Sequence, residues 1–405
     1  MRLAGDQLVR RALTWTFPLY AVGALYVVGP VLGWVLFAAL VWQRRIYDLH
    51  ALVWVWVAGM ITMEIALIAA HINLELSLLS MIKSSIGWAK GWALIALFIA
   101  AGALLRSVES LWRGACHVGA TALLLTPILI AASVAGLPET LYVSPLKVIG
   151  GSGPEYFEVR LYERDTGFGM TRLRYFAPWA PAAGLVGNVL LLLTLREPNF
   201  RWRIVGSVGC VLMIVLSLSR LGWLIALAVP TSLALLRHIR RPPLWFAAAP
   251  AAMLAGIALP QLLPVAEAAM DNLMAARADS TMVRGWLAEI AVQRWQNEAP
   301  LWGHGIVEPG PHLVQFMPIG SHHSWLGLLF VKGIVGVIAL AVPLACTTAY
   351  LAANAIRSDI ARTGLGVMLV LSLYSFGENL EILAYLYWPG LMVVGHALST
   401  LRRST

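Results

Sequence analysis

The run IVGSVGCVLMIVLSLSRLGWLIALAVPTSLALL, residues 204–236, decides the fold, because Arg220 is the one charged residue in an otherwise apolar stretch. A helix needs about 20 apolar residues to cross a membrane, so this run is too long for a single crossing. We therefore expect two helices that turn at Ser219 and Arg220.

The whole chain has the composition of a membrane protein. Of its 405 residues, 60% are hydrophobic and 12% are charged, and the mean hydropathy is +0.77. A soluble domain is about 45–50% apolar and about 25% charged, which excludes that class, and the apolar content excludes a disordered chain. We predict an all-α, polytopic transmembrane bundle of about 12 spans, forming a single integral-membrane domain over residues 1–405. The predicted spans are 13–28, 30–42, 51–71, 91–105, 117–136, 177–195, 204–219, 221–236, 244–263, 334–354, 364–378 and 383–400.

The first two predicted spans also come from one run that is too long for a single crossing, and we expect it to turn near Gly29 and Pro30. The distribution of charge supports both hairpins. With both termini in the cytoplasm, the predicted inner segments hold more than half of the 29 Lys and Arg residues and a quarter of the 20 acidic ones, as the positive-inside rule requires. We attribute the net charge of +9 to this topology rather than to nucleic-acid binding.

Two external segments are longer than a connection needs, and long loops on a rigid scaffold often carry function. The first covers residues 137–176. The second, residues 264–333, contains a helical pattern with Ser280 as its N-cap. We expect an amphipathic helix there, lying on the outer membrane surface with Arg284 in its first turns. The three cysteines lie in separate apolar stretches and predict neither a disulfide framework nor a metal site.

Arg220, Arg284 and His322 are the strongest candidates for chemistry. An arginine between apolar arms is costly unless it pairs or faces a wet cavity, and its planar guanidinium suits a phosphate; a snorkelling interfacial arginine is the alternative. His322 and His323 stand where the chain re-enters the membrane, and imidazole suits acid–base work near neutral pH. Histidines that only hydrogen-bond locally are the alternative for this pair. Other histidines of the same loop fit no zinc spacing, so no metal or cofactor is predicted.

Four short motifs occur along the second half of the chain: Ser219-Arg220, Arg284-x-Trp286, Pro-x-x-Gly-x-Gly at 300–305, and a His-Asn-x-x-Leu-type motif at 322–326 followed by Gly-x-x-Gly at 333–336. Together they resemble the O-antigen ligase and polymerase (Wzy-like) superfamily of bacterial inner-membrane glycan transferases. The interval to the following glycines places His322 at the family's histidine, and His323 stands where the family has asparagine. The number of spans and the position of the second long loop extend the resemblance over the whole topology.

The resemblance implies a multi-pass enzyme of the bacterial inner membrane, with both termini in the cytoplasm and its site in the periplasm. Such an enzyme transfers a glycan from an undecaprenyl-diphosphate carrier to a sugar hydroxyl on another glycan or on a lipid A core, without a metal. Arg220 and Arg284 would hold the diphosphate, and His322 would take the acceptor's proton in a displacement that inverts the anomeric carbon. Membrane lipid and other glycan-assembly proteins are expected partners. Substrate binding is predicted for three further residues, Arg172, Arg174 and His323. For the two arginines, which stand just before a predicted span, a purely interfacial position is the alternative.

Two alternatives stay open. A transporter or flippase for the polysaccharide or its lipid carrier would place ionisable residues near the middle of the membrane, and Glu64 is the clearest such residue. Ligase and polymerase are not distinguished, although Arg294 and Gly305 fit an Arg-x10-Gly spacing seen in some polymerases. Glu378 and Glu381, near the outer end of a predicted span, receive no role.

Overall fold

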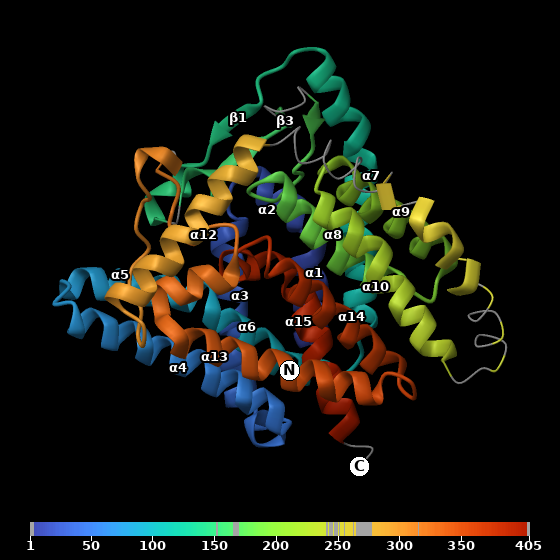
Figure 1. Cartoon of the computed structure of the whole chain (residues 1–405). Coiled ribbons are helices and arrows are strands. Elements are labelled where there is room, and N and C mark those ends of the chain that lie inside the picture. Colours follow the sequence, from blue (N-terminus) through green and yellow to red (C-terminus); the bar gives the residue numbers. More distant parts are fainter. Residues whose placement is uncertain are drawn as a thin grey trace.

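The computed structural model describes residues 4–150, 153–164, 170–239, 278–314 and 316–402, with short helical pieces between 242 and 264. It is 76% helical with almost no sheet (Figure 1), in agreement with an all-α membrane bundle. Among the described residues, seven helical segments are long and apolar enough to cross a membrane: α3 (Leu25–Trp42), α4 (Ala51–Asn73), the run Leu78–Leu104, α7 (Glu109–Val134), α10 (Arg220–His238), α13 (Ser324–Asn354) and α15 (Leu380–Arg402). The run Leu78–Leu104 contains α5 (Leu78–Lys90) and α6 (Trp92–Ala101). The other helices are α1 (Ala4–Thr14), α2 (Thr16–Ala21), α8 (Ala180–Thr194), α9 (Phe200–Leu216), α12 (Ala278–Glu298) and α14 (Asp359–Tyr374).

The predicted division of residues 204–236 into two helices is confirmed. Helix α9 ends at Leu216, and α10 begins at Arg220. The side chain of Ser219 accepts a hydrogen bond from the backbone N–H of Gly222 at 3.2 Å and so caps α10, which satisfies one of the unpaired donors at a helix start.

The turn predicted at Gly29 and Pro30 is wrong. Both residues lie inside α3, and the chain turns instead at Gly23, which has a φ of +68°. Gly29 serves packing: a Cβ there would lie 2.6 Å from the Cβ of Tyr385, so its absence lets α3 approach α15 closely. Pro30 is tolerated because neighbouring helices in a bundle compensate for a lost backbone hydrogen bond.

The first long loop contains the strands of the described chain. Strand β1 (Thr140–Val143) pairs antiparallel with β2 (Glu158–Arg160), and β3 (Glu163–Arg164) pairs antiparallel with β4 (Thr171–Arg172), with Glu163 opposite Arg172. The loop packs on the bundle through aromatic contacts, such as the 4.6 Å between the ring centroids of Tyr26 and Tyr156. The predicted span 244–263 is described only in part: a little over half of its residues are described, all as helix, and they include most of a short apolar helix at Ala252–Gln261, while the others lie outside the described residues.

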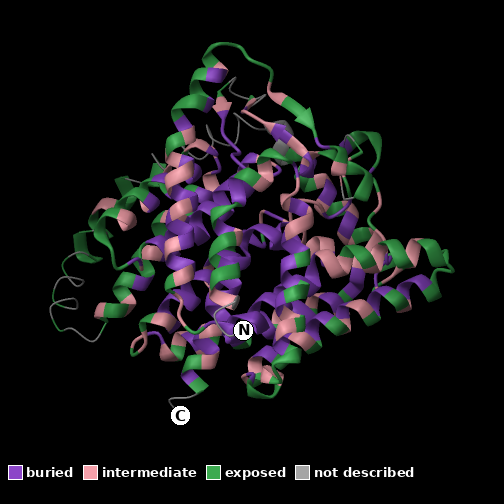
Figure 2. Cartoon of the chain, turned by 180° about the vertical axis from the view of Figure 1, so that it is seen from behind, coloured by how far each residue is buried: buried purple, intermediate pink, exposed green. Residues whose placement is uncertain are grey.

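Buried residues fill the middle of the bundle, while exposed residues lie on the outer helices (Figure 2). Every residue of α6 is buried, and α15 is nearly as enclosed. Lipid is as apolar as the side chains, so helices in a membrane associate through close packing of small residues. Helices α7 and α9 meet in this way, since a Cβ on Gly209 would overlap the carbonyl oxygen of Gly119.

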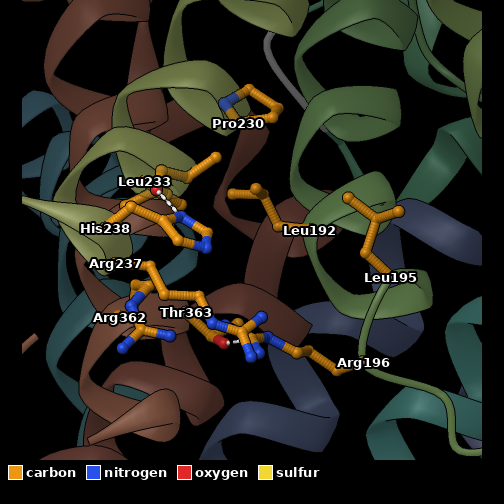
Figure 3. Close-up of a pocket in the computed structure, with 10 residues that line it drawn as sticks. Leu192, Leu195, Arg196, Pro230, Leu233, Arg237, His238, Arg362 and Thr363 are labelled. Atoms are coloured by element: carbon orange, nitrogen blue, oxygen red, sulfur yellow. Dashed lines mark hydrogen bonds between the residues drawn. The ribbon is translucent and has the colours of Figure 1, made fainter. Parts of the chain in front are cut away.

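Charged residues lie at both ends of the helical bundle. At one end, the starts of α8, α10, α13 and α15 lie near the end of α14. The opposite ends of α8, α10 and α14 carry a group of basic side chains, among them Arg196, Arg237 and Arg362 (Figure 3).

Candidate functional site

The loop between α14 and α15, residues 375–379, fixes the start of α13. The backbone N–H of Ser324 donates to the carbonyl oxygen of Ser375 at 2.9 Å, and the Ser324 hydroxyl donates to the carbonyl oxygen of Glu378 at 2.7 Å. The N–H of His323 donates to Oδ1 of Asn379 at 2.9 Å. His323 is therefore held against this loop, and His322 directly precedes His323 in the chain.

His323 caps α13. Its Nδ1 accepts a hydrogen bond from the backbone N–H of Leu326 at 3.3 Å. Asparagine is a favoured N-cap because its side-chain oxygen accepts the same kind of bond. Capping thus gives His323 a structural role at the start of α13. Its substrate-binding role stays a prediction.

His322 has a strained backbone and a half-buried side chain. Its φ is +62°, a region that residues other than glycine adopt at a cost and that recurs at functional sites. Among the described residues, no hydrogen bond is made to its imidazole. The pKa of His322 is lowered to about 4. Burial is the larger cause, and the positive charge of Arg284 is the smaller one. His322 is therefore neutral at pH 7 and able to accept a proton.

Arg284 lies on α12, which begins at Ala278, two residues before the predicted N-cap Ser280. That detail of the prediction is wrong, because a run of polar residues offers several starting points for a helix. On the same helix, Val283 and Leu287 pack against Val314 of the loop. The predicted apolar face is thus covered by the protein itself, and its place on a membrane surface stays a prediction. The side chain of Arg284 is exposed.

Glu378 is a buried carboxylate in the same neighbourhood. The residue is 2% exposed, and its Oε2 accepts a hydrogen bond from Nε1 of Trp179 at 2.9 Å. Burial raises its pKa to about 7, against the hydrogen bond from Trp179 and the positive charges of Arg284 and Arg172. Arg284 therefore acts electrostatically on both His322 and Glu378.

Arg172 joins the first long loop to the turn before α10. It is 8% exposed, its Nε donates to the carbonyl oxygen of Ser217 at 3.2 Å, and its Nη1 lies 3.6 Å from Oε1 of Glu163. The next residue, Leu173, donates its N–H to the carbonyl oxygen of Leu216 at 2.9 Å. These bonds bring Arg172 to the corner where α10 begins.

Arg220 is the first residue of α10 at this corner. Ser219 beside it contacts Tyr374, the last residue of α14, and the N–H of Glu378 donates to the carbonyl oxygen of Tyr374 at 2.8 Å. The structure thus places Arg220 at the same end of the bundle as His322, linked to it through Tyr374 and Glu378.

Arg174 points into its own loop. Its side chain is 2% exposed and donates to the carbonyl oxygen of Pro178 and, at 3.3 Å, to that of Glu158. These bonds stabilise the loop, and substrate binding by Arg174 stays a prediction.

Helix α13 breaks at Gly333, which has φ +61° and ψ −164°. The turn containing Pro300, Leu301 and Gly303 docks on the break. The N–H of Ile334 donates to the carbonyl oxygen of Pro300 at 3.1 Å, and that of Val335 to Leu301 at 3.4 Å. In return, the carbonyl oxygens of Phe330 and Val331 accept from the N–H groups of His304 at 2.8 Å and Gly305 at 2.9 Å. Irregular backbone inside a membrane protein needs such internal partners.

Close packing of this turn explains why residues 303 and 305 are glycines. A Cβ on Gly303 would lie 2.5 Å from the backbone nitrogens of Lys332 and Gly333. A Cβ on Gly305 would lie 2.8 Å from Nδ1 of His71. The Pro-x-x-Gly-x-Gly motif therefore packs this turn closely against the break in α13.

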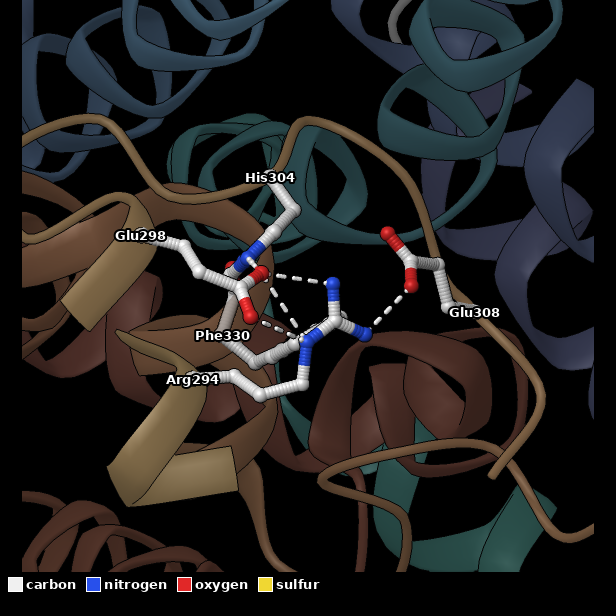
Figure 4. Close-up of polar contacts among 5 residues, drawn as sticks. All are labelled: Arg294, Glu298, His304, Glu308 and Phe330. Carbon is white, nitrogen blue, oxygen red and sulfur yellow. Dashed lines mark hydrogen bonds and ion pairs between the residues drawn. The ribbon is translucent and has the colours of Figure 1, made fainter. Parts of the chain in front are cut away.

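An ion-pair cluster fastens α12 to the same region (Figure 4). Nε of Arg294 donates to both carboxylate oxygens of Glu298 at 3.0 Å, and its Nη1 pairs with Glu308 at 2.5 Å. Nε2 of His304 lies 2.8 Å from Glu298, and its ring stacks on Phe330 with 4.1 Å between centroids. The bond to Arg294 lowers the pKa of Glu298 to about 2. Arg294 thus forms ion pairs with Glu298 and Glu308, which its spacing from Gly305 in the sequence did not indicate.

An apolar groove of about 500 Å³ adjoins the site between α13 and α14. Its Phe376 contacts His323, with 5.7 Å between ring centroids. The groove is lined by Trp325, Ala341, Leu344, Ala345, Thr348, Ala349, Ala352, Ser372 and Phe376.

No group of three or more His, Cys, Asp or Glu side chains placed to hold a metal ion occurs in the described part of the chain. Compared with known proteins, the chain matches no family model, and no curated protein is similar enough to count as a relative.

Proposed function

We propose that this protein is a surface-polysaccharide ligase or polymerase, which transfers a glycan from an undecaprenyl-diphosphate carrier to a sugar hydroxyl. The observation that carries the proposal is the convergence of charge at one end of the bundle. The charge of Arg284 acts on both His322 and Glu378, and that of Arg172 acts on Glu378. Arg220 begins the adjoining helix.

In the proposed reaction, the guanidinium groups of Arg284 and Arg220 hold the lipid diphosphate and stabilise its growing negative charge. The acceptor hydroxyl oxygen attacks the anomeric carbon, the bond from that carbon to the diphosphate breaks, and the hydroxyl proton passes to the neutral imidazole of His322. One displacement inverts the anomeric carbon, and the step uses no metal. The carrier's hydrocarbon chain lies in the apolar groove next to His323.

We further propose a topology of about 12 spans in the bacterial inner membrane, with both termini in the cytoplasm and the site in the periplasm. Arg196, Arg237 and Arg362 at the opposite helix ends support this orientation, because arginines accumulate on the cytoplasmic side.

The test is transfer by the purified protein from a lipid-diphosphate-linked glycan to an added acceptor. His322→Ala should abolish transfer and leave donor binding intact, because only the proton acceptor is lost. His312→Ala is the matched control, since His312 is an exposed histidine of the same loop, and it should keep full transfer. Near-normal transfer by His322→Ala would remove the proposed base.

Ligase and polymerase differ in the acceptor, a lipid A core or another carrier-linked glycan. The surface glycans of a deletion strain distinguish them. Loss of chain length with lipid A still capped by one unit identifies a polymerase, whereas free polymer on the carrier identifies a ligase.

A transporter or flippase for the polysaccharide or its lipid carrier is the second candidate, favoured by the break in α13. Lys332 beside the break is 3% exposed, its Nζ donates to the carbonyl oxygen of Met63 at 3.3 Å, and the charges of Glu64 and Glu381 act on it. Broken helices with ionisable residues are typical of transporters. Carrier flipping in proteoliposomes without sugar transfer to an acceptor would favour this function over the enzyme.

A further inference from the structure

A cavity of about 250 Å³ lies among α8, α10 and α14, at the helix ends opposite the candidate site. One wall of the cavity is apolar, and the other carries basic side chains that face the same space (Figure 3). The apolar residues are Leu192, Leu195, Pro230, Leu233 and Ala234, and the polar ones are Arg196, Arg237, His238, Arg362 and Thr363.

Positive charge exceeds negative charge around this cavity. Nε of Arg196 donates to the Thr363 hydroxyl at 2.8 Å, and its Nη1 lies 3.8 Å from Oδ2 of Asp359. Arg362 pairs with the same carboxylate. Among the described residues, no hydrogen bond or ion pair is made by the side chain of Arg237. Two guanidinium groups therefore share one carboxylate, whose side chain is itself 67% exposed, and the third guanidinium, that of Arg237, adds a further positive charge to the same cavity.

The guanidinium groups also act on one another. Burial is the largest cause that lowers the pKa of Arg196, Asp359 opposes it, and the charges of Arg362 and Arg237 lower the pKa further. Like charges this close repel, and an anion between them would remove the repulsion.

We propose that this cavity binds an anionic phospholipid, with the phosphate between Arg196, Arg237 and Arg362 and an acyl chain against the leucines. Guanidinium groups suit phosphate oxygens because they donate paired hydrogen bonds in one plane. Basic pockets between membrane helices bind lipid headgroups on this electrostatic basis. A free phosphate would use the same cations but would gain nothing from the apolar wall formed by residues such as Leu192 and Leu233.

The test is native mass spectrometry of the full-length protein in detergent with phosphatidylglycerol, phosphatidylcholine or inorganic phosphate. Phosphatidylglycerol should bind more tightly than phosphatidylcholine. Arg237→Gln should weaken phosphatidylglycerol binding by about fivefold, because one cation near an anionic lipid is worth about 1 kcal/mol. Arg201→Gln is the matched control, since Arg201 is exposed at the start of α9 and does not line the cavity. It should leave binding unchanged.

Ala234→Trp separates the cavity from its charges. Ala234 lines the cavity and is exposed, so a large side chain there fills the space while every arginine stays. Phosphatidylglycerol binding should fall several-fold. Equal binding of the two lipids, or equal loss in Arg237→Gln and Arg201→Gln, would overturn the site. Inorganic phosphate that binds as tightly as phosphatidylglycerol would overturn the assignment to a lipid.

Discussion

Gly333→Ala should destabilise the protein, because the break in α13 depends on this glycine. Its φ of +61° and ψ of −164° lie in a region that is essentially open to glycine alone, and a side chain there costs about 1–3 kcal/mol. The new Cβ would also overlap the carbonyl oxygen of Leu301 and push the docked turn away. Losing the two hydrogen bonds from Ile334 and Val335 adds about 0.5–1.5 kcal/mol each. The expected loss in the free energy of unfolding is therefore about 2–6 kcal/mol.

The assay is thermal unfolding of the purified variants in one detergent, with Gly285→Ala as the matched control. Gly285 lies inside α12 with open space around its Cα, so alanine there should raise stability by up to about 1 kcal/mol through helix propensity. The same change of residue thus has opposite signs at the two positions. A Gly333→Ala variant as stable as the parent would refute the conclusion that the break in α13 and its docked turn depend on a glycine at this position.

Three further predictions concern titration. Burial is the main cause of the low His322 pKa of about 4, so Arg284→Gln should move this pKa only part of the way back toward 6.5. The pH dependence of diethyl pyrocarbonate modification at His322 measures the change, and an unmoved pKa would contradict an electrostatic effect of Arg284 on His322. Burial raises the Glu378 pKa from 4.5 to about 7, so the contribution of Glu378 to stability is present below pH 4.5 and is lost as pH rises through 7. Glu378→Gln should therefore reduce the fall in melting temperature between these pH values. An unchanged dependence of melting temperature on pH would argue that Glu378 is not buried. Arg294 lowers the Glu298 pKa from 4.5 to about 2, so that pair stabilises the protein above pH 4.5 and is lost as pH falls through 2; Glu298→Gln should be the less stable form near neutrality and should approach the parent in acid, whereas equal stability near neutrality would leave the pair without net effect.

The sequence predicts those parts of the fold that depend on local pattern. The hairpin at Ser219 and Arg220 follows from one polar interruption in a long apolar run, and the structure has it there. The turn at Gly29 was predicted wrongly because composition does not distinguish a glycine that turns the chain from one that admits a neighbouring helix. Gly23 makes that turn through its positive φ, and Gly29 makes room for Tyr385.

In the candidate site, too, local sequence pattern identifies some residues, and contacts between distant residues determine the others. Arg220 stands out in the sequence because a charged residue between apolar arms is costly there, and His322 stands out because imidazole suits acid–base work near neutral pH. The part played by Glu378 depends on how the loop after α14 reaches the start of α13, and Asn379 enters the same contact. Such long-range contacts have no periodic signal along the chain, although an acidic residue directly after an apolar helix was a hint.

The electrostatics of the site bear on the proposed reaction in one further way. A pKa near 4 keeps the His322 imidazole neutral, yet a base works best when its pKa lies near the working pH. Arg284 is one cause of the low value, and a diphosphate bound to Arg284 would offset that cation. The anion would in addition favour the protonated imidazole. On the proposed function, donor binding therefore raises the base strength of His322 in the complex that needs it, and the free enzyme keeps the imidazole neutral and ready to accept the proton.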